Sequence, residues 1–152
     1  IDNTKKIVEI ITYCLMPNHF HFLVKQLRDN GISEFMRKFI NSYTKYRNTK
    51  HRISGPAFQA LFKAVRIETD EQLIHLSRYI HINPVASFII DEKELESYQW
   101  SSLPEYLATS GFCEMQTVLS QFKTVHAYKN FIHDHISYAK NLEKIKHLTF
   151  EN

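Results

Sequence analysis

The amino-acid sequence predicts a single α+β domain, in which a β-hairpin near the N-terminus is followed mainly by helices. Residues 7–26 consist of two runs rich in β-branched and aromatic residues, separated by a short turn-forming segment. Much of the later sequence repeats apolar residues at the three- and four-residue spacing of amphipathic helices. The 152 residues, 43% of them hydrophobic, are sufficient for one ordinary core. No internal repeat or low-complexity linker divides the sequence.

The predicted hairpin has its first strand at residues 7–15 and its second at residues 19–26. The intervening MPN at 16–18 has turn-forming character. Successive side chains of a strand point to opposite faces. We therefore expect His19 and His21 on the same face of the second strand, with the phenylalanines that follow them on the other face.

The next predicted element is an amphipathic helix over residues 32–46. Its apolar positions are Ile32, Phe35, Met36, Phe39, Tyr43 and Tyr46, and its opposite stripe carries Arg37, Asn41, Lys45 and Asn48. A polar loop is predicted to follow, with Lys50, His51, Arg52 and Gly55. A further strand is predicted at residues 57–68.

A second helix is predicted from the capping-box pattern of Thr69 and Gln72. Its core stripe comprises Leu73, Leu76 and Ile80, and Pro84 is expected to end or kink it. The remainder is expected to be helical, with one long amphipathic stretch over residues 125–148.

Positive charge is concentrated in the first part of the chain. Residues 1–68 contain 12 of the 19 lysine and arginine residues but only 5 of the 16 acidic residues. A polyanion such as a nucleic acid would dock on this basic half. Moderate charge asymmetry is common, however, and by itself it more often indicates only a soluble surface than a site for nucleic acid.

The sequence shows no apolar run near the roughly 20 residues of a membrane span, and Cys14 and Cys113 lack the spacing of a disulfide framework. These features predict a cytosolic protein with reduced cysteines. Because Ile1 stands almost directly before the first predicted strand, we expect an N-terminal segment to be missing.

Two histidines at positions i and i+2 of a strand present their imidazoles on one side, where they can share a divalent cation if a third ligand comes from elsewhere. Alone, such a pair is more often an ordinary polar strand face. Similarly, a tyrosine beside a helix core stripe, such as Tyr79, is usually a packing residue.

The combination of segments is more specific than either motif. YCLMPNHFHFLV at 13–24 and RYIHINPV at 78–85 resemble, in that order, the His-hydrophobic-His motif and the nucleophile helix of IS200/IS605-type (HUH, Y1) tyrosine transposases. The similarity is greatest to the relatives that act on repetitive extragenic palindromes. GPAFQALFKAVRIETDEQL at 55–73 and YQWSS at 98–102 resemble the same group.

The resemblance implies that Tyr79 is the nucleophile and that His19, His21 and Asn83 hold a divalent metal, Mg²⁺ or Mn²⁺. Tyr79 and Asn83 are four residues apart, so they share a helix face. Because Asn83 precedes Pro84, its side chain is expected to be displaced from the ideal helical position. The implied reaction leaves a 5′-phosphotyrosine and a free 3′-OH.

The resemblance also implies a ferredoxin-like or RRM-like antiparallel sheet with helices on one face. A catalytic core over residues 1–103 would lack its first strand, and residues 104–152 would form a helical extension. The implied setting is a nucleoid-associated protein of a prokaryotic cytoplasm.

The implied DNA is a single strand that carries a hairpin, bound by a homodimer. The candidate phosphate-binding residues are Arg37, Lys45, Arg47, Lys50 and Arg52. Two other functions remain open: a hairpin-binding regulator that does not cut, and a metal hydrolase that activates water.

Overall fold

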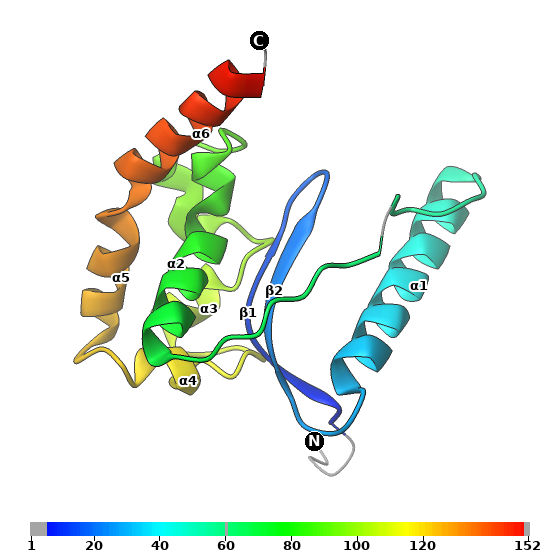
Figure 1. Cartoon of the computed structure of the whole chain (residues 1–152), viewed down its shortest axis with the longest axis horizontal. Coiled ribbons are helices and arrows are strands. Elements are labelled where there is room, and N and C mark those ends of the chain that lie inside the picture. The colour runs from blue at the N-terminus through cyan, green and yellow to red at the C-terminus, as the bar shows by residue number, and fades with distance from the viewer. Residues whose placement is uncertain (1–5, 60, 151–152) are drawn as a thin grey trace. The chain divides into compact units, whose positions relative to one another are not determined.

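The computed structural model of the protein describes residues 6–59 and 61–150, and Figure 1 shows the course of the chain. The predicted α+β class is confirmed, because the described residues form a two-stranded antiparallel sheet and six α-helices. The elements are β1 (Val8–Leu15), β2 (Phe20–Gln26), α1 (Gly31–His51), α2 (Asp70–Ala86), the 3-10 helix η2 (Glu92–Ser97), α3 (Leu103–Ala108), α4 (Gln116–Leu119), α5 (Val125–His133) and α6 (Ile136–Phe150).

The chain forms two compact units. The first contains the segment up to Glu9 together with Val24–Arg66, and the second contains Ile10–Leu23 together with the chain from Ile67 onward. The predicted boundary at residue 103 between core and extension stays a prediction. The prediction that an N-terminal strand is missing concerns a region outside the described residues.

The predicted hairpin is confirmed, with strand bounds within one residue of those expected. Its turn is closed by a hydrogen bond of 2.9 Å from the Met16 amide to the His19 carbonyl. His19 therefore stands directly before β2, whereas His21 is its second residue.

The edge of β1 away from β2 is covered by residues of the second unit. The Leu15 amide donates to the Trp100 carbonyl at 2.7 Å, and the Ser102 amide donates to the Tyr13 carbonyl at 3.0 Å. The Glu114 amide donates to the Ile10 carbonyl at 2.8 Å. These bonds satisfy backbone groups that an exposed strand edge would leave unpaired. The segment YQWSS thus lies along the strand that leads to the histidines.

Helix α1 is longer than predicted, and Lys50 and His51 belong to its last turn rather than to a loop. No glycine or proline interrupts residues 47–51, so nothing local stops the helix there. It ends at Arg52, which adopts the left-handed conformation with φ of 53° and donates its amide to the Asn48 carbonyl.

The prediction of a strand at residues 57–68 is wrong for the described part of that segment. Residues 57–59 and 61–68 contain no regular secondary structure. Leu61 and Val65 are 91% and 88% exposed, and the segment pairs with no strand among the described residues. Strand propensity is not sufficient without a neighbouring strand to accept the backbone hydrogen bonds.

Helix α2 begins as predicted, with the Thr69 hydroxyl accepting the Gln72 amide at 3.1 Å. The helix does not end at Pro84 but continues to Ala86, so Asn83 keeps its helical position. Along α2, the buried side chains comprise Ser77, Ile80, His81, Ile82, Asn83, Pro84 and Val85.

The predicted long C-terminal helix is divided into α5 and α6 at Asp134 and His135. The His135 amide bonds the Ile132 carbonyl, three residues back, instead of continuing the four-residue pattern of the α-helix. Both helices pack against α2, which lies at the centre of the second unit (Figure 1).

A buried polar network fixes α2 within this unit. The His81 side chain is fully buried, and its two ring nitrogens lie 2.8 Å from the Tyr128 hydroxyl and 2.8 Å from the Ser102 hydroxyl. Ser102 Oγ also accepts the Tyr13 amide at 2.9 Å. The network therefore links α2 to α5 and to β1, so it determines where Tyr79 and Asn83 lie relative to the hairpin.

Cys14 and Cys113 are both buried free thiols. Burial raises the pKa of the Cys14 thiol to about 12, which favours its protonated and unreactive form. Across the described residues, no helix is both long and apolar enough to cross a membrane.

Candidate active site

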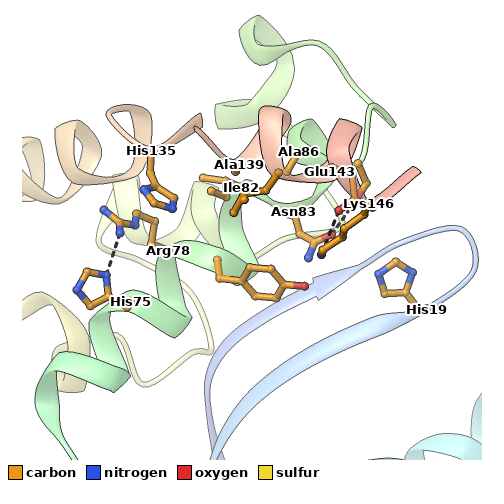
Figure 2. Close-up of a pocket in the computed structure, with 13 residues that line it drawn as sticks. His19, His75, Arg78, Ile82, Asn83, Ala86, His135, Ala139, Glu143 and Lys146 are labelled. Atoms are coloured by element: carbon orange, nitrogen blue, oxygen red, sulfur yellow. Dashed lines mark hydrogen bonds and ion pairs between the residues drawn. The ribbon is translucent and has the colours of Figure 1, made fainter. Parts of the chain in front are cut away.

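One face of α2 lines a pocket of about 530 Å³ (Figure 2). His75, Tyr79 and Asn83 follow one another at four-residue intervals and all lie on this pocket wall. His19 comes from the hairpin, and the remaining lining residues come from α2 and its C-cap, from α6 and from the turn before α6. The pocket belongs entirely to the second unit.

The two histidines predicted as metal ligands lie side by side. The ring centroids of His19 and His21 are 5.0 Å apart, and the rings are nearly perpendicular. A cation lies about 2 Å from each ligating nitrogen, so two imidazoles that share one ion have ring centres roughly 5 Å apart. The observed spacing fits a shared ion.

The environment of His21 favours its neutral, ligating form. Burial lowers the pKa of the His21 imidazole below its ordinary value, and the adjacent His19 lowers it further. His19 is exposed, and its Nδ1 lies 2.6 Å from the Asn18 side-chain oxygen. A hydrogen bond at Nδ1 leaves Nε2 of His19 as the candidate donor atom to a metal.

Asn83 reaches this pair despite the proline that follows it. Its side-chain amide nitrogen lies 3.4 Å from His21 Nε2, and its amide oxygen accepts from the Ser87 hydroxyl at 3.0 Å. Turning the amide over exchanges the two atoms, and the Ser87 hydroxyl can accept as readily as it donates. The Asn83 oxygen can therefore face the histidines without losing its support.

These residues fit a divalent cation, with two imidazoles and one amide oxygen as donors and an open side toward the pocket. Within 6–59 and 61–150, no cluster of three histidine, cysteine or acidic side chains could hold a metal. The candidate set thus depends on Asn83 as its third donor. Because all three donors are neutral, they leave the ion with its full positive charge.

Tyr79 lies next to His21, one of the two candidate histidine ligands. The ring centroids of His21 and Tyr79 are 5.5 Å apart in an edge-to-face arrangement. The Tyr79 side chain is 46% exposed, whereas Asn83 is only 5% exposed. An exposed phenol beside a buried ligand is accessible to a large substrate and is not a core packing residue. The structure thus brings together Tyr79 and the three predicted ligands.

The predicted DNA-binding residues lie on α1 or at its C-cap, in the first unit. Arg37, Lys45 and Arg52 are exposed. At 3.6 residues per turn these three fall within about 80° around the helix axis. Arg47 and Lys50 point about 160° and 140° away from Lys45, so the five side chains do not form one stripe.

Sequence reasoning missed several residues of the pocket. Ser87, the C-cap residue of α2, supports Asn83 from one turn further on, and His75 lies one turn before Tyr79. Both could have been found by extending the four-residue spacing from Tyr79 in each direction. No local pattern indicates His135, Glu143 or Lys146, which only the packing of α6 and its preceding turn brings to the pocket.

Comparison with known protein families shows to which family the chain belongs. The family model for IS200-like transposases matches residues 3–83, which is more than half of the chain. The chain belongs to the IS200-like transposase family. No curated protein and no solved structure gives a match to it.

The matched span of this IS200-like transposase contains all four residues of the candidate site, His19, His21, Tyr79 and Asn83. Membership supports a transposase-type function with DNA as the partner. The narrower resemblance to relatives that act on palindromic repeats stays a prediction.

Proposed function

We propose that this transposase is a metal-dependent single-strand DNA endonuclease and strand transferase with Tyr79 as its nucleophile. The observation that carries the proposal is the joint position of Tyr79, His21 and Asn83. The exposed phenol lies against one candidate ligand, and the second lies one helical turn away on the same face. A tyrosine that served only in packing would not require this surrounding donor set.

A divalent cation held by His19, His21 and Asn83, Mg²⁺ or Mn²⁺, would polarise the scissile phosphate and offset the charge that develops on it. The neutral imidazole of His21 offers its lone pair for this purpose. Ser87 holds the Asn83 amide, and the His81 network holds the helix that carries both Asn83 and Tyr79.

In the proposed step, the Tyr79 phenolic oxygen attacks the phosphorus of a phosphodiester. The bond from phosphorus to the 3′-oxygen breaks, so the 5′-phosphate becomes joined to Tyr79. The phenolic proton is lost to water, and the departing 3′-oxygen takes up a proton to become a hydroxyl. The phosphotyrosine conserves the bond energy, which allows a second 3′-OH to reverse the step on another strand.

The proposed substrate is a single strand that carries a hairpin near the cleavage site, and the proposed active form is a homodimer. Phosphate contacts from Arg37, Lys45 and Arg52, which share one side of α1, would hold the strand. Because hairpin recognition and cutting are separable, the same scaffold without cleavage would act as a DNA-binding regulator.

The decisive experiment compares wild type with Tyr79→Phe on end-labelled single strands with hairpins, in Mg²⁺ or Mn²⁺. We expect wild type to give a protein-linked label on denaturing gels and Tyr79→Phe to give none. The substitution removes one exposed oxygen, so hairpin binding and thermal stability should stay near wild type.

Two results would redirect the proposal. Cleavage by Tyr79→Phe at the wild-type rate would point to a hydrolase that activates water. Binding by wild type without an adduct on any hairpin tested would favour the regulator.

A further inference from the structure

The end of the pocket away from His19 is lined by one arginine and two histidines. Figure 2 shows His75, Arg78 and His135 gathered on one side, and His19, Asn83, Glu143 and Lys146 on the other. Tyr79 lines the same pocket. It contacts His21 of the candidate metal site and directly follows Arg78 of the nitrogen-rich end in α2.

Three contacts orient Arg78 at this nitrogen-rich end. Its guanidinium carbon lies 4.1 Å from the ring centroid of Phe131, and one nitrogen donates to the Phe131 carbonyl at 3.5 Å. A second nitrogen lies 2.8 Å from His75 Nδ1. These contacts use a minority of the five N–H donors of a guanidinium. The cation is thus oriented in advance, with donors left for a ligand.

The charge of Arg78 is not neutralised at contact distance. Within the described residues, no carboxylate lies within 4.0 Å of its guanidinium, although Asp134 is near enough to raise the pKa of Arg78 against the lowering effect of burial. The acid at the other end of the pocket, Glu143, is paired with Lys146 at 3.3 Å. A half-buried, unpaired guanidinium is a costly arrangement unless an anion compensates it.

His135 adds a third nitrogen group to the same place. Burial lowers the pKa of its imidazole, and the electrostatic effects of Arg78 and His75 lower it further. The three side chains come from α2 and from the turn between α5 and α6, so tertiary packing builds this cluster. Arg78 and His135 suit a phosphate, which accepts bidentate bonds from arginine and a single bond from an imidazole. His75 orients Arg78 through its Nδ1, and its Nε2 lies 3.9 Å from the Glu71 carboxylate.

We propose that His75, Arg78 and His135 form a subsite for a backbone phosphate of the DNA strand, next to the phosphate that Tyr79 attacks. This inference deepens the proposed function and rests on it. The subsite would position the strand: with one phosphate held by Arg78, the neighbouring phosphodiester is brought to the Tyr79 hydroxyl. Arg78 is then a positioning residue, and its contribution to DNA binding does not depend on metal.

The test measures binding of a short fluorescein-labelled oligothymidylate to the full chain in EDTA, over a series of salt concentrations. Oligothymidylate has no hairpin, and EDTA prevents cleavage, so the salt slope reports the phosphate contacts. Arg78→Gln should weaken binding several-fold and reduce the salt slope by about 0.7, the value for one lost phosphate contact on a single strand. Arg78→Lys should keep most of the slope because it keeps the charge.

A matched control is Lys93→Gln, which removes an equally positive but exposed side chain paired with Asp91 outside the pocket. Its slope should equal that of wild type. His135→Asn, which leaves the Phe131 stack intact, should weaken binding in the same direction as Arg78→Gln. Thermal unfolding of each variant measures any loss of packing between α2 and α5.

An unchanged slope in Arg78→Gln with a lowered Tm would overturn the subsite and make Arg78 a packing residue. Failure of wild type to bind oligothymidylate at low salt would overturn it as well. Because no step of this test requires an adduct, its outcome is independent of the Tyr79→Phe experiment. A reduced salt slope in Arg78→Gln, together with no adduct from wild type on any substrate, would support the subsite and refute the nuclease.

Discussion

The side-chain amide of Asn83 lies 3.4 Å from the Nε2 atom of His21, across 62 residues of sequence. This contact joins the hairpin to the helix that carries Tyr79, and it occurs although Asn83 is followed by Pro84. Helix α2 accommodates the proline close to its end, where only the short segment up to Ala86 follows. The third predicted ligand is therefore available to the first two.

Removal of the hydroxyl that supports Asn83 should reduce cleavage without removing a ligand. In Ser87→Ala we expect activity to fall about tenfold, because partners that orient ligands typically contribute tenfold to a hundredfold. Asn83→Ala should have a larger effect. Cleavage rates measured over a metal titration check this, with the Ser87→Ala defect shrinking as metal rises. Equal rates in Ser87→Ala and wild type would show that the amide needs no support.

Substitution of either histidine should stop cleavage by a route that differs from loss of the nucleophile. We expect His19→Ala and His21→Ala to form no adduct at ordinary metal concentrations, and to regain part of the activity in excess Mn²⁺. Tyr79→Phe should show no such rescue. Adduct yield against metal concentration distinguishes the two cases. Wild-type cleavage by both alanine variants in EDTA would exclude a metal at this site.

The arrangement of basic residues on α1 predicts unequal effects on DNA binding. Arg37→Gln and Lys45→Gln should each lower the salt slope by about 0.7 for single strands, because both side chains are exposed on one side of the helix. Arg47 is partly buried and donates to the Asn48 side chain at 3.3 Å, so Arg47→Gln should have a smaller effect. Fluorescence anisotropy over a salt series measures each slope. If Arg37→Gln and Lys45→Gln both bind like Lys93→Gln, α1 is only a solvated surface.

The buried His81 predicts a loss of stability in mild acid. Burial lowers the pKa of His81 to about 3 from an ordinary value of 6.5, so only the unfolded chain takes up a proton between these values. The contribution of neutral His81 to the free energy of unfolding is fully present above pH 6.5 and decreases as the pH falls toward 3. Near pH 5 this amounts to a loss of about 2 kcal/mol in the free energy of unfolding.

Urea unfolding of wild type and His81→Asn at neutral pH and near pH 5 measures this effect. We expect His81→Asn to be less stable at neutral pH and to lose less stability on acidification. His126→Asn is the control, because His126 is exposed on α5 and should leave the pH dependence unchanged. The same pH dependence in wild type and His81→Asn would contradict the prediction.

Local sequence determined those elements of the site that depend only on residues close by in the chain. Alternation around His19 and His21, the turn at residues 16–18 and the Thr69 cap all act within a few residues, and the hairpin and the start of α2 appear as predicted. The four-residue spacing likewise placed Tyr79 and Asn83 on one helix face. Resemblance to transposases assigned their roles, since periodicity alone does not distinguish a nucleophile from a packing tyrosine.

Only the tertiary structure decided which neighbours those elements meet. Residues 57–68 have strand propensity but no partner strand among the described residues, and that propensity alone does not form a sheet. The approach of Asn83 to His21 depends on the buried bonds of His81, whose partners lie 21 and 47 residues away. The cluster of Arg78 with His135 depends on the turn that divides α5 from α6. Hydrogen bonds and packing between segments distant in sequence carry no local signature, so no pattern of spacing could have predicted them.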